Sequence, residues 1–270
     1  MKDIEISKYL SILKLDDCNN SLDDLKKLQQ SHMINISFEN LDVIAGRSIN
    51  LDYENLFNKI VNNGRGGYCF ELNILYSFLL KALGFSPKPV LGRVWLRNPD
   101  KTPPRNHLAH LIQQNDETFV TDVGFGGLTT RIPLNINDLS EINDNDGLVR
   151  ILPFDDNQFM VQRKVNDDWT NQYSFENVDI SEEDIFISNY YMSTNPKSHF
   201  YNDNFIGKFT NDGRIGLFNN QISKRKGIEV VSKKSIAYGS EWIEAVNNNF
   251  GLNLDFSKEE FNRVFQKKSI

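Results

Sequence analysis

The chain has 270 residues, which is long enough for one large domain or for two or three small ones. Its composition, 39% hydrophobic and 24% charged, is that of an ordinary globular protein. The net charge of −6 argues against a dedicated nucleic-acid binder, which would carry a basic face.

The chain gives no sign of a membrane or secretion signal. No run approaches the roughly 18 apolar residues of a membrane span. The first residues, MKDIEISKYLSILKL, mix acids and bases and lack a signal-peptide core with a small-residue cleavage site. We therefore expect a cytoplasmic protein without a membrane partner.

The N-terminal part predicts helices. Apolar residues recur three and four apart in four segments, with Asn20 or Ser21 as a helix cap in the second. The last of them is the longest apolar helical pattern and ends at Gly84, shortly before Pro87. The expected helices span residues 5–15, 21–35, 53–63 and 69–84.

The spacing of apolar residues changes near Lys88. From there the helical pattern gives way to short runs rich in Val, Ile, Thr and aromatic residues, separated by Pro, Asn and Gly. We expect an antiparallel barrel or small sandwich here, with strands in residues 87–97, 107–114, 117–126, 148–154, 158–165 and 169–176. From residues 181–196 onward the pattern is mixed, with strands expected in 206–219 and 226–234 and an amphipathic helix in 257–268. The fold class is therefore α+β.

The two cysteines, Cys18 and Cys69, could pair only once, and a cytosolic chain of this size has no need of that link. We expect both to be reduced. Cys18 lies among acids in LDDCNNS, which would raise its pKa and leave it unreactive. The four histidines are scattered, and no CxxC, HExxH or phosphate-loop motif is present, so we expect no metal site.

Cys69 lies where the longest predicted helix begins. The unpaired N–H groups and the dipole at a helix start favour a thiolate and could hold an oxyanion. Gly66 and Gly67 allow a tight backbone path before it, and Arg65 adds positive charge. On position alone, a buried apolar cysteine is an equally good interpretation.

A nucleophilic cysteine needs a base and an orienting group. His107 opens one predicted strand and Asp122 closes the next, so an antiparallel pair would bring them together, with the carboxylate fixing the imidazole. His110 is a rival base on the opposite sheet face, and spacing alone does not choose between them. Either histidine could instead be a satisfied core residue, and Asp122 a turn-former.

Four blocks of the sequence resemble, in order, those of the arylamine N-acetyltransferase family. They are SFENLDV (37–43), RGGYCFELN (65–73), HLAHLI (107–112) and DVGFGG (122–127). STNPKSHF (193–200) and DGRIGL (212–217) resemble weaker C-terminal blocks. The resemblance thus covers nearly the whole chain.

The resemblance implies that Cys69 is the nucleophile, His107 the base and Asp122 the orienting acid, and it decides against His110. The implied fold is a helical domain (1–85), a β-barrel domain (86–188) and an α/β lid (189–270). The implied chemistry is ping-pong: acetyl-CoA, a co-substrate and not a tightly bound cofactor, acetylates the cysteine. An arylamine, arylhydrazine or N-hydroxyarylamine then takes the acetyl group.

The resemblance also implies contacts with the substrates. Phe38 and Phe125 match aromatic positions of the acceptor pocket, although without the motifs plain core packing would be the better interpretation. Gly126 and Gly127 leave room beside the pocket for the cofactor, and Phe200 is a candidate contact for its pantetheine arm.

Two departures from the family pattern stand out. Ile12 occupies the place of an arginine that joins a glutamate–arginine network, so Glu39 is expected to pair with Arg65 alone. Ser37 replaces a proline, which affects backbone stiffness more than chemistry.

Two alternatives remain: a papain- or transglutaminase-like hydrolase with the same triad, and a non-enzymatic binding module. The Arg-Gly-Gly block favours the transferase. The oligomeric state, monomer or dimer, stays open.

Overall fold

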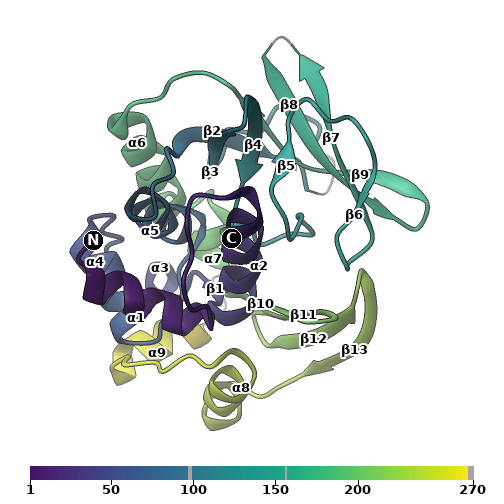
Figure 1. The fold of residues 1–270 in the computed structure, drawn as a ribbon. Coiled ribbons are helices and arrows are strands. Elements are labelled where there is room, and N and C mark those ends of the chain that lie inside the picture. Colours follow the sequence, from purple (N-terminus) through teal and green to yellow (C-terminus); the bar gives the residue numbers. More distant parts are fainter. Residues whose placement is uncertain (97–98, 156, 267–270) are drawn as a thin grey trace.

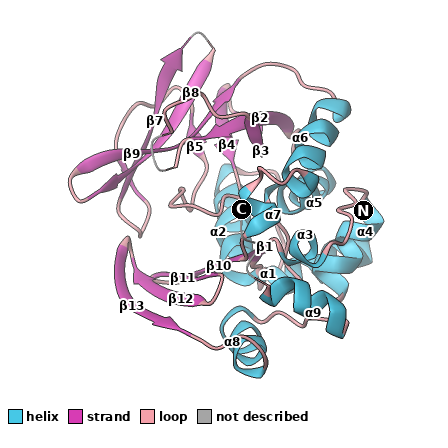
Figure 2. Cartoon of the chain, turned by 180° about the vertical axis from the view of Figure 1, so that it is seen from behind, coloured by secondary structure: helices cyan, strands magenta, loops and turns pink. Residues whose placement is uncertain are grey.

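The computed structural model describes residues 1–96, 99–155 and 157–266 and has an α+β fold (Figure 1). Helices gather on one side of the molecule and two antiparallel sheets on the other (Figure 2). The described helices are α1 (Asp3–Leu13), α2 (Leu22–Asn35), α3 (Leu41–Ala45), α4 (Tyr53–Leu56), the π-helix η1 (Phe57–Asn62), α5 (Cys69–Ala82), α6 (Glu182–Thr194), α7 (His199–Asn202), α8 (Ser240–Phe250) and α9 (Lys258–Phe265).

The four helices predicted in the N-terminal part are confirmed. The Ser21 hydroxyl caps α2 by accepting a 3.2 Å hydrogen bond from the Asp24 N–H. The third predicted helix begins as α4 and continues as the π-helix η1. Helix α5 is the centre of the helical layer, because apolar residues on several of its faces are buried in one core.

The larger sheet is a curled half-barrel in which β5 and β6 form the two edges, so the predicted barrel is open. Its strand order is β5-β4-β3-β2-β9-β8-β7-β6. The strands are β2 (Lys88–Val94), β3 (Arg105–Gln114), β4 (Glu117–Thr121), β5 (Leu134–Asn135), β6 (Ile142–Asn143), β7 (Leu148–Asp155), β8 (Gln158–Val165) and β9 (Asp168–Glu176). The strand predicted over 87–97 ends at Val94, and Arg97 lies outside the described residues.

The smaller sheet joins segments from both ends of the chain. It comprises, in spatial order, β1 (Phe38–Glu39), β10 (Phe205–Thr210), β11 (Gly213–Phe218), β12 (Gln221–Lys226) and β13 (Glu229–Ser235). Phe38 in β1 pairs with Gly207 in β10, so the N-terminal helical part supplies an edge strand of the C-terminal sheet. This pairing draws the two parts together around one site.

Helix α8 was not predicted, because its sequence SEWIEAVNNNF carries three consecutive asparagines, which are weak helix formers. Its Trp242, Val246 and Phe250 are buried against the smaller sheet in a core of their own. The helix predicted over 257–268 is α9, and residues 267–268 lie outside the described part of the chain. None of the described helices is both long enough and apolar enough to cross a membrane.

Candidate active site

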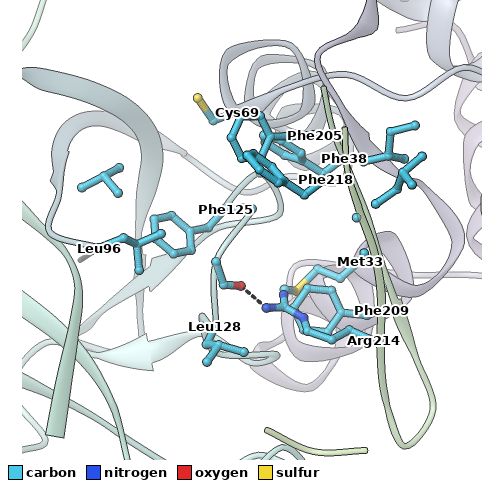
Figure 3. A pocket seen from close by; sticks show the side chains of 18 of the residues that line it. Met33, Phe38, Cys69, Leu96, Phe125, Leu128, Phe205, Phe209, Arg214 and Phe218 are labelled. Atoms are coloured by element: carbon cyan, nitrogen blue, oxygen red, sulfur yellow. Dashed lines mark hydrogen bonds between the residues drawn. The ribbon is translucent and has the colours of Figure 1, made fainter. Parts of the chain in front are cut away.

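Cys69 is the first residue of α5 and lines a cavity of about 490 Å³. The cavity lies where the helical layer, the half-barrel and the smaller sheet meet, and its walls are largely apolar, with several phenylalanine rings (Figure 3). His107 lines the same cavity from β3. The nucleophile and base inferred from the sequence therefore share one space.

Glycines let three backbone segments converge on Cys69. A Cβ on Gly66 would lie 2.1 Å from the Ser37 carbonyl oxygen, and one on Gly67 would lie 2.8 Å from the Glu71 Cβ. A Cβ on Gly124 would lie 2.8 Å from the Cys69 Cα. Such distances are too short for any side chain, so only glycine permits this approach.

His107 and Asp122 are brought together by the hairpin of β3 and β4. The strands are antiparallel, with His110 opposite Thr121, so Asp122 directly follows β4 and lies next to β3. The Nε2 atom of His107 lies 2.7 Å from the Asp122 Oδ2 atom, and both residues are buried. Phe125 and Tyr173 pack edge-on against the imidazole at ring separations of 5.1 and 4.9 Å, which fixes its plane.

The carboxylate of Asp122 is held as an ion. Burial by itself raises its pKa, but the His107 side chain, Asn73 and the Gly124 N–H together keep the pKa below its ordinary value. The Asn73 Nδ2 and the Gly124 N–H donate to Oδ1 at 2.9 and 2.8 Å. The charged acid is therefore available to orient the imidazole through Oδ2.

His110 is separated from this arrangement. It is buried, it is not among the residues that line the cavity, and burial lowers its pKa to about 4. Because His110 does not line the cavity, it cannot take a proton from Cys69 directly. The choice of His107 over His110 thus has a geometric reason.

The two cysteines are free thiols, as expected. Burial raises the pKa of Cys69, and the negative charge of Asp122 raises it further. Backbone hydrogen bonds from Leu108 and from Phe70 in the first turn of α5 lower this pKa, so the helix start favours a thiolate as the sequence suggests, while burial opposes it. Burial and Asp24 also raise the pKa of Cys18, which lies apart from the cavity.

The five predicted substrate-contact residues all line the cavity: Phe38, Phe125, Gly126, Gly127 and Phe200. Figure 3 shows Phe125 and Phe38 beside the open space. A Cβ on Gly126 would lie 3.3 Å from the Phe38 ring, and one on Gly127 would lie 2.3 Å from the Phe125 ring. Because neither glycine carries a side chain, the Phe38 and Phe125 rings can occupy their observed positions.

Sequence reasoning missed three residues of the site. Asn73 lies one helical turn after Cys69, and that spacing could have placed it on the same face. Gln29 in α2 accepts from the Thr121 hydroxyl at 2.7 Å and from the Asp122 N–H at 3.3 Å, and no local pattern indicates it. Arg214 lines the cavity from β11, within the DGRIGL block.

A second group of buried charges lies behind the first turn of α5 and is called here the charge cluster: Glu39, Asp42, Lys59, Arg65 and Glu71. Arg65 binds Glu39 and Asp42, each at 2.8 Å. Lys59 binds Asp42 and Glu71, each at 2.7 Å. The predicted Glu39–Arg65 pair is present, but Asp42 shares Arg65 with Glu39, while Ile12 packs against the apolar core.

No metal centre was expected, and in residues 1–96, 99–155 and 157–266 no three His, Cys, Asp or Glu side chains are grouped to hold a metal ion. The polar groups at the cavity include a thiol, an imidazole with its carboxylate, and two guanidinium groups. Such a set suits nucleophilic acyl chemistry.

Comparison with known proteins gives consistent matches. Residues 21–259 match the family model described as N-acetyltransferase. The arylamine N-acetyltransferase of Escherichia coli K12 is 32% identical over 243 residues, which is 89% of this chain and 86% of that protein. The Salmonella typhimurium protein named arylamine N-acetyltransferase / N-hydroxyarylamine O-acetyltransferase is 30% identical over 89% of this chain and 86% of that protein.

Solved structures of similar proteins match this fold over nearly the whole chain. The Salmonella typhimurium enzyme has a TM-score of 0.92 at 29% identity and covers 98% of each chain. The Mycobacterium marinum arylamine N-acetyltransferase, solved in complex with CoA, has a TM-score of 0.91 at 26% identity, with 97% of this chain and 99% of that chain covered.

Proposed function

This chain belongs to the arylamine N-acetyltransferase family and is an acetyltransferase, and we propose that it works by a ping-pong mechanism through an acetyl-cysteine at Cys69. Acetyl-CoA is the donor and co-substrate. The acceptor is an arylamine, an arylhydrazine or an N-hydroxyarylamine. The observation that carries the proposal is the buried His107–Asp122 pair on the same cavity as Cys69.

In the first half-reaction, His107 takes the proton of the Cys69 thiol as the sulfur attacks the thioester carbonyl. Because Nε2 of His107 faces Asp122, the ring nitrogen available for this transfer is Nδ1. The N–H groups of the first turn of α5 are the donors for the oxyanion. The C–S bond to CoA then breaks, and the CoA sulfur receives the proton from His107.

In the second half-reaction, the acceptor nitrogen attacks the acetyl-cysteine. An arylamine nitrogen is weakly basic and therefore neutral and nucleophilic at pH 7. His107 accepts the proton that this nitrogen loses and returns it to the Cys69 sulfur as the thioester breaks. The free thiol is regenerated, so atoms and protons balance over the cycle.

The raised pKa of Cys69 fits a base-assisted step more closely than a preformed thiolate. The charge on Asp122 disfavours a lone thiolate, but the same charge stabilises the imidazolium that forms when the proton moves to His107. Transfer between the two residues therefore creates an ion pair and no isolated buried anion.

The cavity walls support the acceptor and donor sites expected from the family. Phe38 and Phe125 bind the flat ring of the acceptor, for which apolar walls are suited. Gly126, Gly127 and Phe200 border the path of the pantetheine arm of CoA. The chain divides into a helical domain (1–85), a β-barrel domain (86–188) and a lid (189–270). The lid assignment is supported by β10, β11 and β12, which supply one wall of the cavity.

The test is to mix the protein with acetyl-CoA and follow the release of free CoA thiol with and without an arylhydrazine. We expect steady release only with the acceptor, and an acetyl mass increase on Cys69 without it. Cys69→Ala should lose both signals, while the matched variant Cys18→Ser should keep both. Steady release without an acceptor would instead identify a thioester hydrolase, and an unmodified, inactive Cys69 would favour a binding module.

A further inference from the structure

The pairing of β2 with β3 contains a β-bulge immediately before His107. In the register, His107 pairs with Gly92. The next pair joins Arg105 to Arg93, which leaves Asn106 as an extra residue without a partner on β2. Asn106 also lines the active-site cavity. Bulges beside an active site commonly redirect a side chain, and this one directly precedes the proposed base.

The bulge decides which face of the sheet carries His107. In a regular strand, residues two apart point to the same face, so His107 would share the face of Arg105. Arg105 is exposed and, like Arg93, forms an ion pair with Glu176 on the outer face. Because Gly92 and Arg93 are neighbours on β2, their partners on β3 lie on opposite faces. The extra residue therefore turns His107 toward the cavity while Arg105 stays in solvent.

The side chain of Asn106 completes the hydrogen bonding of the bulge. Its Oδ1 atom accepts a 3.1 Å hydrogen bond from the Val94 N–H. In a regular ladder a backbone carbonyl of the facing strand would accept this bond, so the amide oxygen takes the place of that carbonyl. A side chain without an acceptor at position 106 would leave the Val94 N–H without this partner and would weaken the bulge.

The backbone on both sides of His107 lies against the sulfur of Cys69. The thiol donates to the Asn106 carbonyl, with 3.8 Å between Sγ and the oxygen. Burial raises the pKa of Cys69, and a backbone hydrogen bond from Leu108 opposes that effect. Residues 106–108 thus contact the nucleophile and carry the base, so the course of this segment sets where the imidazole lies relative to the sulfur.

We propose that Asn106 is a positioning residue, whose side chain holds the bulge that keeps His107 on the cavity face and beside the Cys69 sulfur. The proposal rests on the proposed acetyl transfer through Cys69. Without the amide acceptor, the bulge can relax toward regular pairing, which moves His107 toward the face of Arg105. Because His107 acts in both half-reactions, a displaced imidazole slows both.

The first test is steady-state turnover of Asn106→Ala, which removes the acceptor of the Val94 N–H. We expect kcat to fall by about tenfold to a hundredfold, the effect of displacing a catalytic group by about 1 Å. The KM for acetyl-CoA should stay unchanged, because both half-reactions slow together. Asn106→Asp keeps an acceptor at the same place and should recover most of kcat. The control is Arg105→Gln on the outer face, which should keep the wild-type kcat.

Alkylation by iodoacetamide tests the same role without any acetyl transfer. In a Cys18→Ser background Cys69 is the only thiol, and its labelling at pH 7 should slow by about tenfold or more in Asn106→Ala. Adding Asn106→Ala to His107→Gln should cause no comparable further loss, because the amide acts through the imidazole. A further loss of the same size would show that Asn106 does not act through His107 and would overturn the proposal.

Asn106→Leu keeps the volume without an acceptor and serves where the alanine variant fails to fold. The proposal is overturned by a raised KM with unchanged kcat, or by Asn106→Asp no better than Asn106→Ala. Wild-type protein that transfers no acetyl group, yet whose Cys69 alkylation depends on Asn106 and His107, would sink the proposed function alone. An active enzyme whose kcat and alkylation are unchanged by Asn106→Ala would sink the positioning role alone.

Discussion

Two groups of buried polar side chains meet at the first turn of α5, and they differ in whether their hydrogen-bonding capacity is used. In the charge cluster each charged group has a partner of opposite sign within 2.8 Å. At the cavity, the Cys69 thiol has only a 3.8 Å hydrogen bond to the Asn106 carbonyl, and Arg214 binds a carbonyl but no carboxylate among the described residues.

We infer from this difference that the charge cluster serves the stability of the fold and that the groups at the cavity serve the reaction. A buried charge without a partner is costly, so a group that serves only the fold is paired. A group that must bind or move a proton has to keep a free donor or acceptor, and the structure supports it from the other side, as Asp122 supports His107. Substitutions should therefore affect stability in one group and turnover in the other.

Apart from the loss of Cys69 or His107 itself, the largest effect is expected from Asp122→Asn, which removes the carboxylate charge and keeps the shape of the side chain. The amide Oδ1 atom can still accept from Asn73 and the Gly124 N–H, so its NH₂ faces Nε2 of His107. Nε2 must then be the acceptor, and the proton moves to Nδ1, which can no longer act as a base. We expect kcat to fall by about 10⁴-fold with little change in melting temperature.

The control for this prediction is Gln29→Ala, which removes an acceptor from the Asp122 backbone N–H but leaves its carboxylate. It should lose far less activity than Asp122→Asn. Comparable losses in the two variants, measured by CoA release, would mean that Asp122 acts through packing and not through the imidazole tautomer.

The charge cluster is broken by Arg65→Met, which keeps the volume and leaves Glu39 and Asp42 without this cation. Removing one partner of a buried pair costs about 3–5 kcal/mol of unfolding free energy, which urea denaturation can measure. Lys26→Gln is the control, because its 3.9 Å pair with Asp23 is exposed. The folded fraction of Arg65→Met should keep its turnover; a loss of kcat with unchanged stability would contradict the division of roles.

The sequence could point to the three proposed catalytic residues because each lies beside a local signal: a helix start, a strand start and a strand end. The order of the motif blocks selected the trio, and the structure supplied the reason why His110 is excluded. The smaller sheet was beyond such reasoning, because Phe38 pairs with Gly207 across a long sequence separation. The pairing of Arg65 with Asp42, the acceptor role of Gln29 and the bulge at Asn106 likewise depend on tertiary contacts that no short window contains.

A smaller effect in the charge cluster should appear as a pH dependence. Burial raises the pKa of Glu71 from 4.5 to about 7, against the opposing charge of Lys59. The folded state therefore binds more protons than the unfolded state between these values, so the contribution of Glu71 to stability is present below pH 4.5 and is lost as pH rises through 7. The difference in unfolding free energy between wild type and Glu71→Gln should change with pH inside this window only.

The smallest effect on turnover is expected from His110→Gln, which alters the histidine that faces away from the cavity. Burial lowers the pKa of His110 from 6.5 to about 4, so its contribution to stability is present above pH 6.5 and is lost as pH falls through 4. The variant should reduce that acid sensitivity in thermal melts and keep most of the CoA release at pH 7. His107→Gln should abolish turnover at every pH, and equal losses in the two variants would show that the sheet face does not decide which histidine serves Cys69.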